Sequence, residues 1–405
     1  MGNPPFLNDA VLLRPGSEHG NGANLGTGRR SLSQSMGIRE RRARDEMGME
    51  GARVLINMAN QMTPALRLCG DVTDRTHLDL SHESLGPVEA LLLAHDLLLQ
   101  GDVQELNLHG NELCGDGENS YEGSQCWVGL EALAAALQSN TRLTILDLSK
   151  NSLGGVAAAA GVEEAFGCTV LAKLLTSNQS LTMLDLSSCG IGPKGVSMLT
   201  FGLHGNHTLR TLLLDSNELV GREWDDEDEN VEGLQDLGEA LMENATLTTL
   251  SLRACDIGTV GAISLATGVA MNSSLQVLNV LRNDLGEDGT TALLEAARES
   301  GGHCSLTGIP AGAVEVDLSQ QWLGPEDVKL LAHELAQNDT VTKIDLSGNA
   351  LCGVKYGRGT YDISGIHSLA EALHTNVALQ EIDITGSMIR SADVCLFPRN
   401  IMLKF

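Results

Sequence analysis

The chain has 405 residues, of which 42% are hydrophobic but only 3% aromatic, and its formal net charge at pH 7 is −27. A core with so few aromatic side chains must be filled by Leu, Ala, Val and Ile, which suits thin stacked layers better than one thick globular core. The acidic balance argues against a nucleic-acid partner, because binding to phosphates requires a basic face. The charge either keeps the chain soluble or steers a basic protein partner towards it.

The N-terminal 45 residues differ from the rest of the chain. They contain seven Arg and no Lys, many Gly and Ser, and few acidic residues. This composition predicts a disordered arm, and the alternative that it leaves open is an organellar targeting segment. Residues 46–70 carry apolar residues at helical spacing, including Val54, Leu55 and Met58, and are predicted to form a capping helix.

One pattern then recurs ten times over residues 71–390. Its clearest copy, Leu143 to Leu153, has the form L-x-x-L-x-L-x-x-N-x-L, in which alternating leucines place apolar side chains on one face of a short strand. A stretch of helical period, such as Leu130 to Leu137, completes each copy. No copy can bury its apolar face alone, so the copies must stack. Residues 391–405 remain as a C-terminal tail.

The residue at the N position of this pattern is called the turn residue below. Successive turn residues are 28, 38 or 40 residues apart, and a turn Asn is always followed by a long interval. An Asn in this place can satisfy backbone groups that the bend leaves unpaired, and Cys is small and apolar enough to replace it. The predicted structural turn residues are Asn111, Asn151, Cys189, Asn217, Cys255, Asn283 and Asn349.

A second Asn recurs close to the end of each helical stretch. Because Asn tolerates left-handed backbone geometry and ends helices well, these residues are predicted to be helix stops. Five of them belong to N-x-S/T sequons, and the structural role explains the sequons without glycosylation. The positions are Asn140, Asn178, Asn206, Asn244, Asn272, Asn338 and Asn376.

The continuation of the turn carries a family resemblance. Asn283-Asp-Leu-Gly-Glu-Asp-Gly289 has the form L-G-x-x-G after its turn Asn, and Ile191-Gly-Pro-Lys-Gly195 is close to it. With Asn and Cys alternating at the turns, the chain resembles the ribonuclease-inhibitor subtype of leucine-rich repeats, which occurs in ribonuclease inhibitor, in the sensor domains of NOD-like receptors and in the Ran GTPase-activating protein. The resemblance implies an α/β horseshoe solenoid of about ten repeats, with parallel strands on the concave face and helices on the convex face.

The sequence departs from the relatives in three ways. Its long intervals differ from the nearly uniform repeats of ribonuclease inhibitor and are similar to those of the Ran activator, whose long acidic tail is missing here. No nucleotide-binding domain precedes the repeats, as it would in a complete NOD-like receptor. Few residues follow the last turn residue, Ser387, which leaves open a fragment of a larger receptor-type repeat protein.

Four residues before each turn residue, the strands carry a column in which six of ten residues are Asp. This column is expected to face solvent on the concave side, either as plain solvated residues or as an acidic track for a basic partner. At its middle, apolar and Arg side chains replace Asp and Ser, a composition typical of contact hot spots. The candidate partner-binding residues at this place are Leu213, Asp215, Arg253, Leu281 and Arg282.

The inserted segments of the long intervals are expected to emerge along one rim. They and their edges hold all three Tyr and two of the three Trp. Aromatic side chains on loops suit partner recognition, or they pack down and anchor the longer loops. The candidate partner-binding residues of the rim are Tyr121, Trp127, Trp224, Tyr356 and Tyr361.

Signatures of enzymatic chemistry are missing from the sequence. Without a P-loop, a nucleophile elbow or a Cys/His zinc pattern, no catalytic residue, cofactor or metal site is predicted. Nine cysteines without a C-x-x-C pair, and no stretch resembling a signal peptide or a membrane span, predict a cytoplasmic protein. The predicted function is a monomeric scaffold that binds a basic protein or a small GTPase through the concave face and rim. The alternative is a small-GTPase regulator similar to the Ran activator.

Overall fold

A computed structural model describes residues 48–61, 76–99, 102–114, 127–154, 165–222, 229–301, 304–354, 359–390 and 392–405. The predicted arm over residues 1–45 lies outside this part of the chain. The described residues form two compact units that divide after Leu250. None of the described helices is long and apolar enough to cross a membrane.

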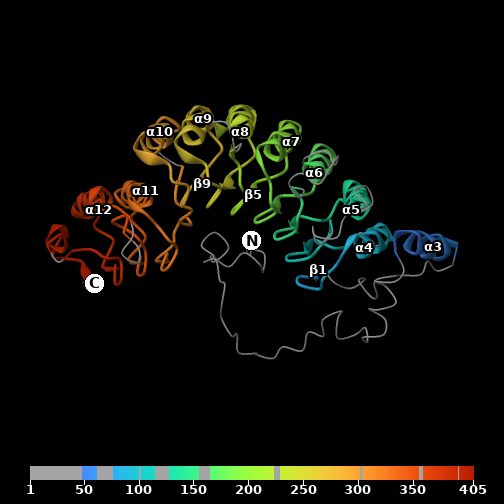
Figure 1. Cartoon of the computed structure of the whole chain (residues 1–405), viewed down its shortest axis with the longest axis horizontal. Helices are drawn as coiled ribbons and strands as arrows, with labels where there is room; N and C mark the ends of the chain where they lie inside the picture. The colour runs from blue at the N-terminus through green and yellow to red at the C-terminus, as the bar shows by residue number, and fades with distance from the viewer. Residues whose placement is uncertain are drawn as a thin grey trace, which may run out of the picture. The chain divides into compact units, whose positions relative to one another are not determined.

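In the first unit, each repeat contributes a three-residue strand and then a helix, and the strands pair in parallel and in chain order. The helices cover one side of the sheet and leave the other side open (Figure 1). The strands are β1 (His77–Asp79), β2 (Glu105–Asn107), β3 (Ile145–Asp147), β4 (Met183–Asp185) and β5 (Thr211–Leu213). The helices are α3 (Gly48–Gln61), α4 (Pro87–Leu99), α5 (Val128–Ser139), α6 (Phe166–Ser177), α7 (Pro193–His204) and α8 (Glu232–Glu243).

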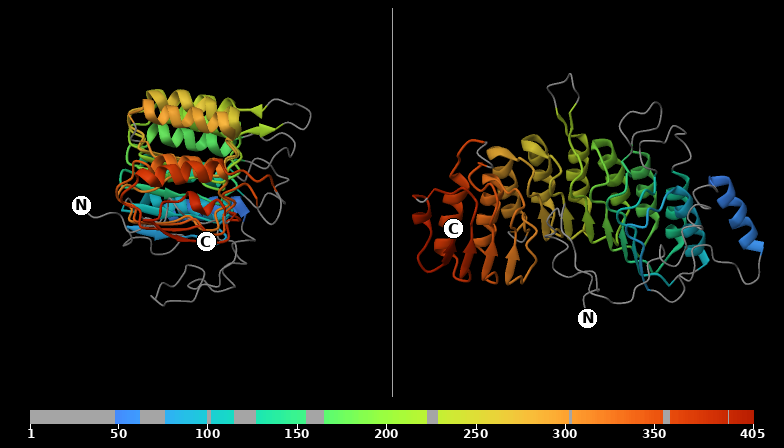
Figure 2. Two further views of the ribbon diagram at one scale, coloured as in Figure 1. Left: turned by 90° about the vertical axis from the view of Figure 1, so that its left-hand side faces the viewer. Right: turned by 60° about the horizontal axis from the view of Figure 1, so that its bottom comes forward.

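The register of the first unit stacks equivalent leucines on top of one another. Leu106 lies beside Leu146, and Leu146 beside Leu184, and these side chains are at most 1% exposed. The insertion between Gly221 and Glu232 begins and ends as an antiparallel ribbon of β6 (Gly221–Arg222) and β7 (Glu229–Asn230), which stands out from the helices in Figure 2. β8 (Thr249–Ser251) lies at the boundary between the units.

The second unit repeats this architecture, and its parallel strands run side by side in Figure 2. The strands are β9 (Val277–Asn279), β10 (Glu315–Asp317), β11 (Lys343–Asp345), β12 (Glu381–Asp383) and β13 (Met402–Lys404). The helices are α9 (Gly258–Met271), α10 (Gly286–Glu299), α11 (Pro325–Leu335) and α12 (Ser364–Thr375), followed by a 3-10 turn, η1 (Val394–Leu396). The repeated strand and helix units of both parts are those of a leucine-rich repeat solenoid.

The alternation of short and long repeats is built into the way the helices meet. α4, α7 and α11 each begin with Pro, a residue suited to the first helical position because its missing N–H has no intrahelical partner there. The helix that follows each of them has Gly as its second residue, and a Cβ at that Gly would overlap the carbonyl oxygen of the preceding Pro. The Gly and Pro pairs are Gly129 with Pro87, Gly233 with Pro193, and Gly365 with Pro325.

The helix-end asparagines do not have the predicted left-handed backbone. Asn178 has φ −76° and ψ 130°, which is an extended conformation. Its Nδ2 donates to the carbonyl oxygen of Leu137 (2.8 Å), and its Oδ1 accepts the N–H groups of Ser180 (2.9 Å) and Leu181 (2.8 Å). Asn is therefore selected here for its amide, which joins one repeat to the previous one and starts the next strand.

The parallel sheet is interrupted between β9 and β10. The residue after Cys304, Ser305, makes a single parallel bridge to Val277 of β9, and β10 then begins a separate sheet without an intervening helix. The extra residues of the interval from Asn283 to Gln321 thus follow helix α10, whereas the insertions predicted for the rim follow the turn.

Residues 391–405 were expected to be a tail, but their described part, residues 392–405, contributes a strand to the sheet. β13 pairs in parallel with β12, and Phe397 and Ile401 are 8% and 7% exposed. The buried core therefore continues into this segment.

Candidate functional site

The turn residues are buried and hold neighbouring repeats together through their side chains. Nδ2 of Asn283 donates to the carbonyl oxygens of Leu252 (2.7 Å) and Val280 (2.9 Å). Its Oδ1 accepts the N–H groups of Cys255 (2.7 Å) and Ile257 (3.3 Å) of the previous repeat. Comparable side-chain hydrogen bonds to backbone groups of the preceding repeat are made by Asn111, Asn151, Asn217 and Asn349.

Cysteine replaces part of this function at alternate turns. Sγ of Cys189 lies 3.2 Å from the carbonyl oxygen of Leu148, to which a protonated thiol can donate. Burial raises the pKa of the Cys189 thiol and raises that of Cys168 to about 12. Both thiols therefore stay protonated, and neither is suited to nucleophilic chemistry. Cys255 is also fully buried at its turn.

The acidic column on the open side of the strands has a structural function. The Oδ1 atom of Asp147 accepts the backbone N–H of Ser149 at 2.9 Å, which closes a short turn at the end of β3. The same contact to the residue two positions later is made by Asp79, Asn107, Asp185, Asn279, Asp317, Asp345 and Asp383. A side-chain oxygen at this position thus ends the strand, and this role does not require a negative charge.

In the first unit the column is electrostatically strained. Burial, and then the charge of Asp147, raise the pKa of Asp185 to about 7, and Asp215 raises it further. The hydrogen bonds from Ser187 oppose this rise because they favour the charged carboxylate. At neutral pH the fold therefore carries a cost for ionising Asp185.

Replacement of Asp185 by Asn tests this cost. We expect Asp185→Asn to raise the stability by about 1–2 kcal/mol at pH 8, because Asn107 shows that an amide oxygen makes the same contact without a charge. The folded pKa of Asp185 is raised, so the gain should fade as the pH drops through about 7 towards 4, where the wild-type carboxyl is protonated in both states. Urea unfolding at several pH values measures the difference, and equal midpoints at pH 8 would refute the expectation.

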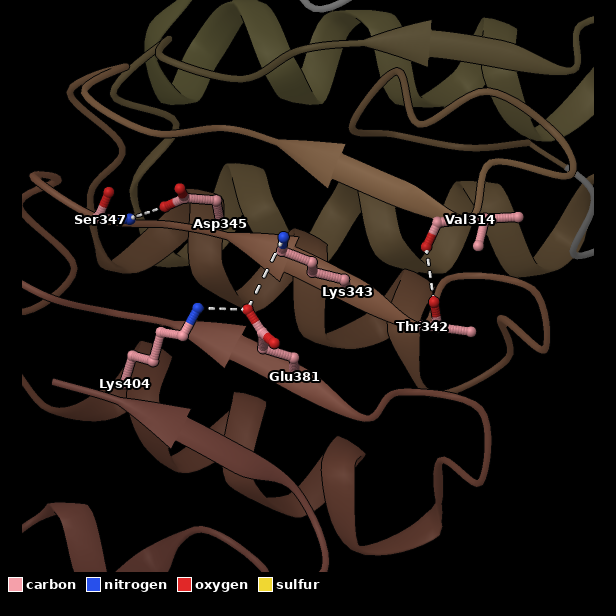
Figure 3. A network of polar contacts seen from close by, with 7 residues as sticks. All are labelled: Val314, Thr342, Lys343, Asp345, Ser347, Glu381 and Lys404. Atoms are coloured by element: carbon pink, nitrogen blue, oxygen red, sulfur yellow. Dashed lines mark hydrogen bonds and ion pairs between the residues drawn. The ribbon is translucent and has the colours of Figure 1, made fainter.

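In the second unit the same side of the sheet is charge-compensated. Nζ of Lys404 lies 2.5 Å from Oε1 of Glu381, and Nζ of Lys343 lies 3.8 Å from the same oxygen (Figure 3). The hydrogen bond from Lys404 lowers the pKa of Glu381. Both lysines also favour the charged form of Asp383, the member of the column on β12.

The residues predicted to form the central contact surface differ widely in exposure. Leu213 of the first unit is 3% exposed, and Arg253 and Leu281 of the second unit are 6% and 0% exposed. The expectation that these three side chains face solvent is wrong. Asp215 and Arg282 are partly exposed.

Arg253 is part of a buried polar junction beside the interruption of the sheet. Its Nη2 donates to Oε1 of Gln321 at 2.9 Å. A second group of hydrogen bonds joins Glu334 of α11 to Ser305 and Thr307 of the segment beside β9, with Glu334 as the acceptor. These side chains join the two sides of the interruption where strand pairing is missing.

Arg282 lines a pocket in the second unit. Its backbone N–H donates to Oδ1 of Asp327 at 2.7 Å, and the N–H of Gly324 donates to Oδ2 at 2.8 Å. Burial raises the pKa of Asp327 to about 6. The pocket has a volume of about 250 Å³ and is lined by Arg282, Asp284, Leu285, Trp322, Gly324, Glu326 and Asp327.

The most exposed tryptophan that the structure describes, Trp322, also lines this pocket and was not among the predicted site residues. It is 55% exposed and has φ 65°, a backbone region that bulky residues rarely adopt. Trp322 directly follows its turn residue, a position held in the other repeats by Ser, Glu, Gly, Asp, Ala or Met. The one aromatic residue in this column was the signal that could have found it.

Of the five aromatic residues predicted for the rim, two pack against other side chains and three lie outside the described residues. Trp127 is 6% exposed, and its ring centroid lies 5.5 Å from that of Phe166, so it packs against the start of α6. Tyr361 is partly buried beneath the guanidinium of Arg390, 3.8 Å from its ring centroid, and its hydroxyl donates to Asp393 at 2.5 Å. Tyr121, Trp224 and Tyr356 lie outside the described residues.

Within the part of the chain that the structure describes, no three His, Cys, Asp or Glu side chains are placed to hold a metal ion.

Comparison with known proteins extends these observations. The family model described as "Leucine Rich repeat" matches residues 139–160, 177–199 and 243–266. The ribonuclease inhibitor of Mus musculus is 30% identical over 166 residues, which cover 36% of this chain and 34% of that protein. That of Sus scrofa is 28% identical over 177 residues, covering 39% and 37%.

Another relative matches more of the chain. NACHT, LRR and PYD domains-containing protein 14 of Mus musculus is 29% identical over 302 residues, which cover 74% of this chain and 25% of that protein. The matched regions thus span about a third or less of these relatives' own lengths. Among solved structures, the TLR13–ssRNA13 complex aligns with a TM-score of 0.40 and 15% identity, covering 78% of this chain and 40% of that one.

Proposed function

This chain is a leucine-rich repeat protein of the ribonuclease-inhibitor type, and from that premise we propose that it is a scaffold that binds a basic protein partner. The observation that carries the proposal is the pocket beside Trp322 in the second unit. An exposed indole next to an arginine is the composition most often found at the energetic centre of protein interfaces. The surface consisting of Trp322, Arg282, Asp284 and Glu326 is called the rim pocket below.

The backbone supports the rim pocket as a contact surface. Trp322 and Arg282 both have φ 65°, and the turn of Arg282 is fixed by the hydrogen bond to Asp327. Positive φ at such residues costs on the order of 1 kcal/mol or more and persists only where the surroundings impose it. The backbone that carries these two large side chains is thus set before a partner arrives, which lowers the entropy lost on binding.

The charge of the rim pocket indicates the chemistry of the partner. Asp284 and Glu326 place carboxylates around the indole, and the whole chain has a net charge of −27. A Lys or Arg side chain of the partner can lie against the Trp322 ring and pair with these carboxylates. The association should therefore weaken as salt is added.

We also propose that the protein works in the cytoplasm. The thiol of Cys189 donates to a backbone carbonyl only in its reduced form. Six described cysteines are buried as free thiols, and a reducing compartment keeps them so.

Affinity purification with quantitative mass spectrometry tests the rim pocket. We expect the double variant Trp322→Ala with Arg282→Glu to recover the partner at least about tenfold less than the wild type, because both changes remove contact energy at its centre. Val377→Ala is the matched control, since Val377 is 94% exposed elsewhere in the second unit. Arg253 is avoided because its guanidinium is buried and bonded to Gln321, so its replacement would also destabilise the fold.

If the double variant recovers as much partner as the wild type and has the same circular dichroism, the rim pocket is not the binding site. Recovery of a small GTPase whose GTP hydrolysis the protein accelerates would instead favour the regulator function.

A further inference from the structure

Helix α9 in the second unit has an outer face that differs from those of the other described helices. It is the only described α-helix without a charged residue. Its buried side consists of small and apolar residues, among them Ala262 and Leu265. Large apolar side chains also lie on its exposed side, where Val260, Ile263 and Met271 are exposed by 50%, 48% and 67%.

The exposed residues of α9 form one stripe along the helix. Val260, Ile263, Thr267 and Met271 follow one another at intervals of three or four residues and so lie on a common face, which is called the α9 stripe below. The stripe is about three turns long, on the order of 16 Å. Thr267 is its one polar member, and it carries a methyl group beside its hydroxyl. Ser264 borders the stripe, and its hydroxyl donates a hydrogen bond to the carbonyl oxygen of Val260 (2.9 Å). This donor is therefore satisfied within the helix when the stripe is covered.

An acidic helix lies directly beside this stripe. α10 packs against α9 so closely that a Cβ at Gly289 would lie 2.9 Å from the Cβ of Ala262 (Figure 1). The exposed residues of α10 include Asp288, Glu295 and Glu299, whereas its exposed Arg298 lies near His333 of α11. These three acidic side chains recur at intervals of seven and four residues, so they share one side of α10 and form a stripe of negative charge there.

We propose that the α9 stripe is a docking surface for an amphipathic helix of a partner, with apolar residues on one face and Lys or Arg along one edge. The apolar face would cover the α9 stripe, and the basic edge would pair with Glu295 and Glu299 of α10. Thr267 is smaller than the other members of the stripe, so a partner helix can approach most closely at the middle of it. A second copy of this chain fits less well, because two molecules with a net charge of −27 each repel one another.

This surface is separate from the rim pocket, so the two proposals can fail independently. A largely apolar exposed surface of this kind is uncommon on soluble proteins and marks interaction sites. A helix laid into an apolar surface is also a recurrent mode of peptide recognition, with anchors at positions i, i+3, i+4 and i+7.

The probe is a synthetic amphipathic helix of Leu and Lys, with Leu at positions i, i+3, i+4 and i+7, labelled with fluorescein. Its binding to the full chain is measured by fluorescence anisotropy at physiological salt. A peptide of the same composition, with its Leu residues distributed around the helix, controls for attraction by charge alone. We expect saturable binding of the amphipathic peptide and at least about tenfold weaker binding of the permuted one.

The decisive variant is Ile263→Glu, which adds a negative charge within the α9 stripe. Attraction by charge alone predicts tighter binding of the basic peptide, whereas docking on the apolar side chains predicts binding weaker by about tenfold or more. Val377→Glu adds the same charge at a site that is 94% exposed, and should leave binding unchanged. Met271→Glu, at a side chain that is 67% exposed, repeats the test if Ile263→Glu folds poorly.

Three results would overturn the proposal. The first is equal affinity of Ile263→Glu and the wild type for the amphipathic peptide. The second is sedimentation showing a wild-type dimer that Ile263→Glu dissociates, which would make a second copy the occupant. The third is Ile263-dependent binding to phosphatidylcholine vesicles without binding of the peptide.

Discussion

Replacing Asn283 by alanine should reduce the free energy of unfolding by about 4 kcal/mol, the largest effect that we expect from a single substitution. The side chain makes four hydrogen bonds of 3.3 Å or less to buried backbone groups, two as donor and two as acceptor. Alanine leaves four backbone groups without this partner, and each such loss costs on the order of 1 kcal/mol or more. No relaxation can bring water to them without opening the turn.

A graded series of variants distinguishes this loss from the effect of an altered side-chain volume. Asn283→Cys should lose only part of the stability, because Cys189 places its thiol against a backbone carbonyl at the equivalent position. Gln138→Ala, at an exposed position of α5, serves as the control and should change stability by less than about 0.5 kcal/mol. Urea unfolding followed by circular dichroism measures all three. A midpoint for Asn283→Ala equal to that of the control would contradict the role of the amide.

Gly233→Ala should destabilise the first unit by roughly 2 kcal/mol, although alanine is the better helix former. Helix propensity favours Ala over Gly by about 1 kcal/mol, and overpacking of a closely packed site costs about 1–3 kcal/mol or more. The methyl group would overlap the carbonyl oxygen of Pro193 and lie 3.0 Å from the Cβ of Val196. A backbone carbonyl cannot rotate away as a side chain can, so α7 and α8 must separate and the steric term prevails.

Gly205→Ala is the matched control for this prediction. A Cβ at Gly205 would meet its nearest neighbour, the Thr176 methyl group, at 3.4 Å, an ordinary contact. Thermal unfolding should show a lower Tm for Gly233→Ala and almost none of this change for Gly205→Ala. A Tm that rises in Gly233→Ala would mean that the two helices adapt, and that the glycine is not required by packing.

The periodic part of the structure could be predicted from the sequence, because it depends on local spacing. Leucines at alternate positions form the strands, and the apolar period of 3.6 residues forms the helices, so that Leu146 is buried where its place in the pattern puts it. The recurrent Gly-Pro at the start of short repeats reads directly as a helix start. The helix-end asparagines were found by position, but their extended backbone depends on a hydrogen bond to the previous repeat.

The candidate site could not be predicted in the same way, since it lies beside the interval between β9 and β10, where the periodic pattern is interrupted. Arg253 and Leu281 occupy strand positions that are open in a regular solenoid, and Asn279 beside them is covered by the segment around Gly308. That segment belongs to the irregular interval between β9 and β10, whose path no periodic pattern describes. The candidate aromatic residues were those in or beside the inserted segments, and Trp322 lies outside these segments.

The turn amides also give the solenoid a direction. The side chain of Asn283 completes the turn of the repeat before it, as Asn217 completes the turn at Cys189 and Asn349 that at Leu323. Each repeat therefore depends on the one that is synthesised next. On the ribosome, a newly emerged turn must wait for its successor before its N–H groups are paired. A premature stop codon that removes one repeat would accordingly damage two, and deletions from the two ends of the chain should differ in severity.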